Sequence, residues 1–328
     1  QSATTGREQL PPLPMSVAAL LLLAPTLPSL AAEPRLIRRA HTLRFLSPVR
    51  RPGSEQARTR HFEQRQDARH GEPCPCSGDM RRRMLMQGLV VASLGAGLSS
   101  PAHADPLWGP KAFACCMATR MGSYETSVQQ EKQRHFEDFY RAAARGDADT
   151  SRPLRILEVG VGPGPNMPLH AKASGGRVEL TGVDVNEDMR PFATTNAKSA
   201  DVAFQFVTGN AQGLPFDEGT FDGVVVTHVL CSVPNPQEAL QEIARVIKPG
   251  GAFMFWEHVG SWDQPGLRMQ QDLFNPLQQM FFQGCNLNRD SMREVQMCDG
   301  FDRVEGRRVY LGDRALLSPH ALGIAYKA

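Results

Sequence analysis

The stretch Arg155-Ile156-Leu157-Glu158-Val159-Gly160-Val161-Gly162-Pro163-Gly164 decides the fold of this chain. Residues 155–159 carry the branched apolar side chains of a short buried strand. A glycine-dense turn follows at once, and glycine lets the backbone reach positive φ and pass close to a bound molecule. The spacing Gly-x-Gly-x-Gly, with an acid two positions before the first glycine, predicts a strand, a cofactor-binding turn and then a helix.

Strands and helices alternate on both sides of this stretch. The predicted strands are 155–159, 178–183, 203–207, 221–227, 252–256, 301–310 and 321–326. The predicted helices include 123–144, one from about 166, 187–199 and one that starts at Asn235-Pro236. This alternation predicts an α/β, Rossmann-like, doubly wound fold with a mostly parallel seven-stranded sheet and an antiparallel late strand. Ligands then bind at the carboxyl ends of the strands.

The segment 265–296 does not fit the strand–helix alternation. It carries an apolar helical stripe, interrupted at Asn275-Pro276, that comprises Leu273, Phe274, Leu277, Met280 and Phe281. The stripe predicts a lid over the substrate side of the sheet, although a helix that faces the core would show the same pattern.

Residues 1–104 have the composition of a targeting region and not of a folded domain. The stretch 33–70 is rich in Arg, lacks Lys and has few acids, as in an organelle transit peptide. Arg81-Arg82-Arg83, the apolar run 85–98 and Ala102-His103-Ala104 then make up an export signal of the twin-arginine type. This order predicts a chloroplast protein of the thylakoid lumen or membrane. An uncleaved helix that tethers the protein peripherally to a membrane is the alternative.

Charge and cysteine usage exclude several classes of partner. The net charge of +2 arises in the Arg-rich amino-terminal region, so it predicts no nucleic-acid partner. The seven cysteines follow no disulfide framework, and Cys74 and Cys76 lack a second Cys or His pair. The sequence therefore predicts no metal site, and a reduced compartment or indifference to redox state.

Two cofactors compete for the glycine turn. A dinucleotide site has Gly-x-Gly-x-x-Gly, so Gly164 comes one position early for a pyrophosphate. S-adenosylmethionine has no phosphate, and the turn needs only to pass close to it. Glu158 then orients the turn or binds the ammonium group through water, and Asn210 and Ala211 are suited to the adenine edge. Asp184, after the second strand, suits the ribose hydroxyls of either cofactor.

Five ordered motifs resemble class I S-adenosylmethionine-dependent methyltransferases, specifically the ubiquinone/menaquinone C-methyltransferase-like branch (methyltransferase type 11). They are Glu158-x-Gly160-x-Gly162-x-Gly164, Asp184, Gly209-Asn210-Ala211-x-x-Leu214-Pro215-Phe216, Phe221-Asp222 and Lys248-Pro249-Gly250-Gly251. The resemblance covers about 123–328 and implies a methyltransferase domain over 105–328. It also implies that S-adenosylmethionine is bound by Glu158, Gly160, Gly162, Gly164, Asp184, Asn210 and Ala211. The family commonly has Asp where Asn210 stands.

A narrower resemblance is to the methyltransferase-like seven group, whose members are membrane-associated and S-methylate small alkyl thiols. It is carried by three segments, Val229-Leu230-Cys231-Ser232-Val233, Gly250-Gly251-Ala252-Phe253 with Glu257-His258-Val259, and Gly284-Cys285-Asn286-Leu287-Asn288-Arg289. The resemblance implies methyl transfer to a small apolar acceptor, foremost a thiol. Two alternatives stay open: C-methylation of a prenyl quinol, and a thylakoid protein that binds S-adenosylmethionine without turnover.

Two histidines are the candidate general bases. His228 and His258 each follow or end a predicted central strand, where the site opens, although structural hydrogen bonding would place a histidine there equally well. Glu257 is predicted to serve the substrate site by orienting His258, with the capping of a loop as the alternative. Asn286 and Arg289 are predicted to shape the substrate mouth, with an ordinary ion pair as the alternative for Arg289.

Overall fold

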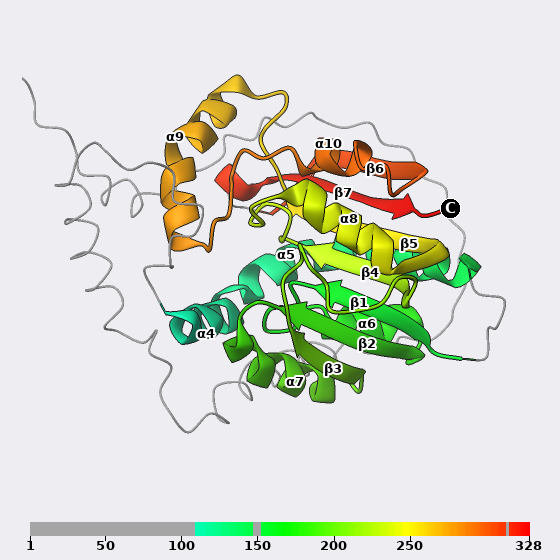
Figure 1. The fold of residues 1–328 in the computed structure, drawn as a ribbon. Helices are drawn as coiled ribbons and strands as arrows, with labels where there is room; N and C mark the ends of the chain where they lie inside the picture. The colour runs from blue at the N-terminus through cyan, green and yellow to red at the C-terminus, as the bar shows by residue number, and fades with distance from the viewer. Residues whose placement is uncertain (1–108, 147–151, 313–314) are drawn as a thin grey trace, which may run out of the picture. The chain divides into compact units, whose positions relative to one another are not determined.

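The computed structural model describes residues 109–146, 152–312 and 315–328, which contain the seven-stranded sheet of Figure 1. The strand order is β3-β2-β1-β4-β5-β7-β6, and only β7 runs antiparallel to its neighbours among these strands. The predicted fold class is therefore confirmed. The strands are β1 (Leu154–Val159), β2 (Val178–Asp184), β3 (Ala203–Thr208), β4 (Phe221–Thr227), β5 (Ile247–His258), β6 (Arg303–Tyr310) and β7 (Pro319–Tyr326).

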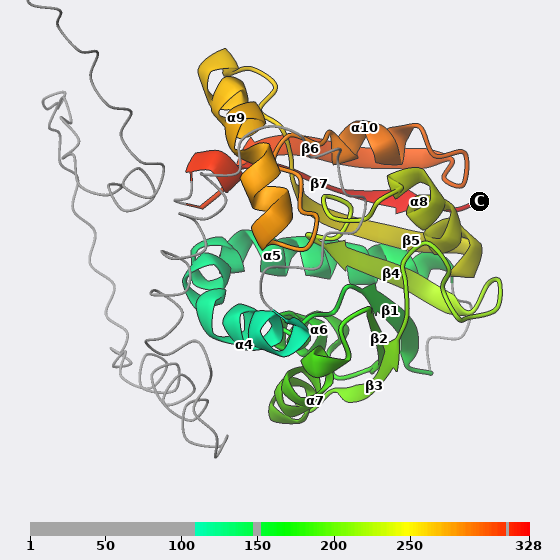
Figure 2. The ribbon, with the colours of Figure 1, turned by 60° about the vertical axis from the view of Figure 1, so that its left-hand side comes forward.

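Helices cover both faces of the sheet. One face carries α5, α6 and α7, while α8 and α10 lie on the other (Figures 1 and 2). The α-helices are α4 (Pro110–Arg120), α5 (Gly122–Ala143), α6 (Met167–Ser174), α7 (Arg190–Ser199), α8 (Pro236–Val246), α9 (Pro265–Phe281) and α10 (Ser291–Gln296). Short 3-10 turns are η1 (Ala144–Gly146), η2 (Glu187–Met189) and η3 (Ala315–Leu317).

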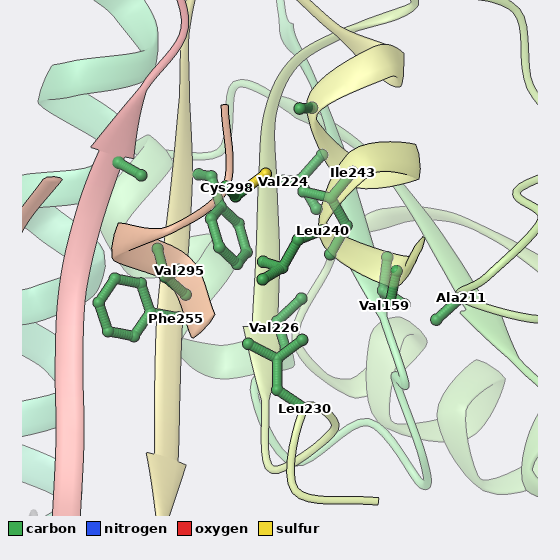
Figure 3. Close-up of a cluster of buried hydrophobic side chains, with 14 of the residues drawn as sticks. Val159, Ala211, Val224, Val226, Leu230, Leu240, Ile243, Phe255, Val295 and Cys298 are labelled. Atoms are coloured by element: carbon green, nitrogen blue, oxygen red, sulfur yellow. The ribbon is translucent and has the colours of Figure 1, made fainter. Parts of the chain in front are cut away.

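The side chains of each strand alternate between the two faces of the sheet, so each face has its own hydrophobic core. Leu157 and Val159 of β1 point to the α8 side, whereas Ile156 points to the α5 side, because successive side chains leave a strand on opposite faces. On the α8 side, Leu240 and Ile243 share a core with Val224 and Val226 of β4 (Figure 3). Both faces are buried, which explains why the central strands read as continuous apolar runs.

The carboxyl ends of the parallel strands form one edge of the sheet. The chain order reverses between β1 and β4, so this edge carries the switch point where doubly wound sheets bind ligands. The arrowhead of β4 points towards this edge, and both α4 and α9 lie beyond it in two views (Figures 1 and 2). The turns after β1, β2, β3 and β4 all reach this edge.

The predicted boundaries differ from the structure at several places. The strand predicted over 252–256 is longer, since β5 begins at Ile247 and ends at His258, and the strand predicted over 301–310 begins at Arg303. The helix predicted over 187–199 divides into η2 and α7, with Pro191 in the first turn of α7. The segment 265–296 forms α9, which continues through Pro276, and α10, which packs on α8. Leu273 of the predicted apolar stripe is 71% exposed, so this residue of α9 does not face the core.

The predicted targeting region, 1–104, lies outside the described residues, so the transit and export signals stay predictions. Within the part of the chain that the structure describes, no helix is both long enough and apolar enough to cross a bilayer.

Candidate functional site

The glycine turn after β1 takes a conformation that only glycine adopts readily. Gly160, Gly162 and Gly164 have φ values of 69°, 53° and 80°, all in the left-handed region. The amide of Gly160 donates to the Val183 carbonyl at 2.7 Å, which ties the turn to β2. A Cβ on Gly160 would lie 2.1 Å from Cγ2 of Val229. The missing side chain of Gly160 therefore leaves room for Val229, which follows β4.

The second glycine faces open space beside Asp184. A Cβ on Gly162 would approach only the Gly160 carbonyl oxygen, at 4.0 Å. The Gly162 amide donates to Oδ2 of Asp184 at 2.9 Å, and the Asn186 amide donates to Oδ1 at 2.9 Å. Burial raises the pKa of Asp184 and outweighs these two hydrogen bonds, which lower it. The next side chain, Val185, is 63% exposed and offers an apolar surface at the same place.

Glu158 is buried and fixes the turn from within. Its Oε1 accepts from Asn166 Nδ2 at 2.6 Å, and its Oε2 lies 3.1 Å from His170 Nε2. Asn166 precedes the first residue of α6, so the carboxylate joins the end of β1 to the start of that helix. Of the two predicted roles for Glu158, these contacts support orientation of the turn.

The turn after β3 lies next to the same site. The Gly209 amide donates to the Asp184 carbonyl at 3.0 Å, which brings Asn210 and Ala211 to the edge. Asn210 is exposed, and its Oδ1 accepts from the Gln212 amide at 3.0 Å. Ala211 is buried in the core on the α8 side. Asn210 can therefore reach a ligand with its amide, whereas Ala211 contributes mainly backbone.

These residues fit S-adenosylmethionine. The open side of Gly162 allows close approach, and each Asp184 oxygen retains acceptor capacity for ribose hydroxyls beyond its one backbone bond. The exposed Val185 side chain supplies an apolar surface for a base. A pyrophosphate needs several free amide donors at the turn, but the amides of Gly160, Val161 and Gly162 already have protein partners.

Residues 228–233, here named the post-β4 segment, lie beside the turn. Three side chains that were predicted to serve the substrate hold this segment through its backbone. Glu257 accepts from the amides of Val229 and Cys231 at 2.8 and 3.1 Å. Asn286 donates to the Cys231 carbonyl at 2.9 Å, and Arg289 donates to the carbonyls of Leu230 and Val233 at 2.6 and 2.7 Å. Contact of these three residues with a substrate stays a prediction.

A hydrogen-bond network determines where His228 carries its proton. Nδ1 of His320 lies 2.9 Å from the Ser318 carbonyl, which can only accept, so it carries the hydrogen. Burial lowers the pKa of His320 to about 4, so its Nε2 is an acceptor and receives the Tyr124 hydroxyl hydrogen at 2.9 Å. Trp256 Nε1 donates to the Tyr124 oxygen at 2.9 Å.

Tyr124 thus has no hydrogen left for His228, whose Nε2 lies 2.9 Å from its oxygen. Nε2 of His228 must donate this bond. Burial, with His320 and His258 nearby, holds the pKa of His228 well below its usual value, so the ring is neutral. Its lone pair is therefore assigned to Nδ1, which is buried and has no partner among the described residues.

His258 faces two cysteines. Its Nε2 lies 3.0 Å from Cys285 Sγ, and Cys285 Sγ lies 3.9 Å from Cys231 Sγ. Burial lowers the pKa of His258, but Cys285 outweighs burial and raises it above its usual value. The contacts with Cys231 and His258 hold the pKa of the Cys285 thiol well below its usual value. The rings of His228 and His258 stack with centroids 5.7 Å apart, so both predicted bases share one site.

Comparison with known proteins identifies the family. A family model described as a methyltransferase domain matches residues 157–255. Human thiol S-methyltransferase TMT1A is 33% identical over 184 residues, which cover 55% of this chain and 73% of TMT1A. Human thiol S-methyltransferase TMT1B is 30% identical over 257 residues, which cover 74% of this chain and 98% of TMT1B. The chain belongs to the S-adenosylmethionine-dependent methyltransferases.

Other similarities are shorter or concern the fold alone. The ubiquinone/menaquinone biosynthesis C-methyltransferase UbiE of Rhodopseudomonas palustris (strain TIE-1) is 38% identical over 125 residues, 38% of this chain and 49% of UbiE. The solved structure of Haemonchus contortus phosphoethanolamine N-methyltransferase 2 with S-adenosyl-L-methionine has 16% identity and a TM-score of 0.48. The match covers 66% of this chain and 60% of the Haemonchus contortus chain.

Several residues of this methyltransferase's site have no distinct sequence signal. Tyr124, Trp256 and His320 fix His228 through hydrogen bonds between residues that are 104 to 196 positions apart, and only the fold brings them together. Tyr124 reads from the sequence merely as one apolar position of a helix. A cavity of about 490 Å³ lies elsewhere, lined by residues of α5, β6 and β7, and it includes none of the glycine turn.

Proposed function

We propose that this methyltransferase transfers a methyl group from S-adenosylmethionine to a small apolar thiol. The supporting observation is the extent of the similarity to TMT1B, which spans 98% of that protein, whereas the similarity to UbiE spans 49% of UbiE. A match over nearly the whole relative includes more than the cofactor-binding half. The residues after β5, Cys285 to Arg289, also contact the post-β4 segment at the same edge of the sheet.

The cofactor side of the reaction rests on the turns after β1, β2 and β3. Gly162 gives the ligand access to the backbone, Asp184 accepts from ribose hydroxyls, and Asn210 offers an amide to the adenine. When bound, S-adenosylmethionine supplies a methyl group on a sulfonium cation. Orientation of the acceptor against that group is the enzyme's main contribution, and alignment of this kind lowers a barrier by roughly 7–11 kcal/mol.

His228 is the base that the geometry favours for the acceptor proton. Its Nδ1 carries an unused lone pair, and the Tyr124 hydroxyl holds the opposite nitrogen of the ring. A free thiol has a pKa of about 8.5, so only a few per cent is thiolate at neutral pH. Acceptance of the thiol proton by Nδ1 as the sulfur–carbon bond forms increases the nucleophilic character of the sulfur in the transition state.

A labelled-methyl assay with the full chain tests the proposal. We expect methyl transfer to small alkyl thiols and none to a prenyl quinol of matched apolar size. Transfer to the quinol alone would contradict thiol methylation and support C-methylation. Binding of S-adenosylmethionine without transfer to any thiol, phenol or quinol would support a non-catalytic role.

The Asp184→Ala variant tests the cofactor site separately. We expect the dissociation constant for S-adenosylmethionine, measured by isothermal titration calorimetry, to rise at least about 10-fold, because two hydroxyl acceptors and the support of the Gly162 amide are lost together. Asp201→Asn is the matched control, since Asp201 is exposed and lies outside the site. Equal affinity of Asp184→Ala and wild type would place the cofactor elsewhere.

A further inference from the structure

Three metal-ligating side chains meet at the carboxyl edge of the sheet. Cys231 belongs to the post-β4 segment, His258 ends β5, and Cys285 follows α9. All three are buried, with exposed fractions of 1%, 5% and 8%. One ligand atom from each lies within 4.8 Å of the other two. Their positions, 27 and 54 residues apart in sequence, show no metal-binding spacing, which is why the sequence predicts no metal.

The distances suit tetrahedral coordination. With Zn–S bonds of about 2.3 Å and Zn–N bonds of about 2.0 Å, a tetrahedral ion separates two sulfurs by about 3.8 Å and a sulfur from a nitrogen by about 3.5 Å. The two sulfurs lie 3.9 Å apart, and His258 Nε2 lies 3.0 Å from Cys285 Sγ. The first distance already suits the ion, the second must lengthen by about 0.5 Å, and His258 Nε2 lies within 4.8 Å of Cys231 Sγ.

The frame around the three ligands is already rigid. Both oxygens of Glu257 are hydrogen bonded to the post-β4 segment, one of them to the Cys231 amide. The Asn286 amide donates to the Cys231 carbonyl at 2.9 Å and joins the two cysteine-bearing segments. Gln278 donates from Nε2 to Cys285 Sγ at 3.4 Å, as outer-shell groups do towards a ligating sulfur. The ligands are therefore held in place by groups that are not ligands themselves.

Charge and chemistry favour a metal over the other uses of two buried cysteines. A disulfide needs sulfurs about 2.05 Å apart, and both cysteines are free in this structure. Burial makes an uncompensated thiolate costly, and a cation bound between the two sulfurs would compensate the charge of both. Two sulfurs and one imidazole are the ligand types that zinc prefers, and three protein ligands leave the fourth position open, as in catalytic zinc sites.

We propose that Cys231, His258 and Cys285 bind one zinc ion whose fourth coordination position is open to solvent or to a thiolate. Zn²⁺ displaces the protons of the two thiols, which pass to solvent, and neutral His258 coordinates through Nε2. The two thiolates balance the charge of the ion. The open position takes the sulfur of the acceptor thiol, a step that rests on the proposed function.

Metal binding is tested on the full chain, purified under reducing conditions. We expect one equivalent of zinc by mass spectrometry. After removal of zinc, titration with Co²⁺ should give thiolate-to-cobalt charge transfer and the visible bands of a tetrahedral ion, saturating at one equivalent. Absence of the charge-transfer band would overturn the proposal. A Cys231–Cys285 disulfide that persists under the reducing conditions of the purification would do so as well.

Variants assign the ligands. Cys231→Ser and Cys285→Ser should each weaken Co²⁺ affinity roughly 100-fold or more and lose part of the charge-transfer band. Cys298→Ala is the matched control, because Cys298 is also buried but packs in the core between β4, α8 and α10 (Figure 3). Unchanged Co²⁺ spectra in both serine variants would overturn the assignment. None of these readouts depends on methyl transfer, so loss of thiol methylation would refute the proposed function and leave the zinc site standing.

Discussion

The orientation of His228 is decided by hydrogen bonds and not by its position in the chain. The sequence places this histidine after a central strand, and the structure confirms that it lies there. Its backbone φ of 58° is uncommon for a residue with a side chain. The ring's tautomer follows from the Tyr124 hydroxyl, which has one hydrogen and three partners.

The His228→Gln variant tests the base. The glutamine amide can keep the bond to Tyr124 but has no lone pair at the place of Nδ1. We expect kcat for thiol methylation to fall at least about 10-fold at pH 7, while the affinity for S-adenosylmethionine stays within about threefold. The deficit should shrink as the pH approaches about 8.5, because the acceptor then ionises unaided.

Initial-rate kinetics across this pH range, with calorimetry for the cofactor, provide the measurement. Tyr124→Phe is the companion variant: the His228 ring remains, but nothing fixes its tautomer, so kcat should fall less than in His228→Gln. A His228→Gln enzyme with wild-type kcat at pH 7 would remove His228 from the mechanism.

At the scale of elements, the one residue of α9 that is fully buried is polar. Gln271 is fully buried, and its Oε1 accepts from the Ser261 amide at 2.7 Å. Its Nε2 donates to the carbonyls of Val259 and Leu316 at 3.1 and 2.9 Å. Met269 and Leu273 on the same helix are 69% and 71% exposed. Hydrophobicity alone would predict that Met269 and Leu273 are buried and that Gln271 is exposed.

The paired variants Gln271→Ala and Leu273→Ala test this attachment. Gln271→Ala removes the partner of three backbone groups, two of them in buried hydrogen bonds, so we expect it to lower the free energy of unfolding by about 2–4 kcal/mol. Leu273→Ala should change it by less than about 0.5 kcal/mol. Urea unfolding gives both values, and amide exchange in α9 should rise only in Gln271→Ala. Equal effects of the two variants would contradict the assignment.

The sequence predicts the elements well where local and tertiary preferences agree. The strand over 221–227 matches β4 residue for residue, because a short run of β-branched valines that is buried on both faces favours a strand of a parallel sheet. The prediction is weaker for α9. Its apolar stripe fits either a lid or a core helix, and the exposure of Leu273 is fixed by contacts that come from elsewhere in the chain.

For the whole molecule, Asp222 joins three strands at the amino edge of the sheet. It accepts from the Arg155 amide of β1 at 2.8 Å, from Arg152 at 2.7 and 2.8 Å, and from Lys248 of β5 at 2.5 Å. Burial alone would raise the pKa of Asp222, but these partners lower it from 3.8 to about 2. The folded state therefore favours the ionised form.

This shift makes part of the stability dependent on pH. A depressed folded pKa contributes stability that is present above the unfolded value near 3.8 and is lost as the pH falls through about 2. We expect Asp222→Asn to lower the free energy of unfolding by about 2 kcal/mol at pH 7 and by roughly half of that at pH 3. Urea unfolding at both pH values provides the measurement, with exposed Asp299→Asn as control. A deficit that does not change with pH would show that charge is not the cause.

The targeting prediction also belongs to the whole chain. Residues 1–104 fused to a fluorescent protein should direct it to chloroplasts in plant or algal cells, because the Arg-rich, acid-poor stretch precedes an export signal. Replacement of Arg81, Arg82 and Arg83 by Lys should block the second step and leave the fusion in the stroma. A cytosolic fusion would contradict the prediction.

The sequence by itself determined the order of strands and helices along the chain, the glycine turn and the cofactor class. These depend on patterns within a few residues, such as the alternation of strands with helices and the position of Gly164. Only the tertiary structure decided that Glu257, Asn286 and Arg289 hold the post-β4 segment, that His228 presents Nδ1, and that two cysteines meet His258. Those contacts join residues far apart in the chain, and their partners are set by the packing of the sheet edge, which no local pattern encodes.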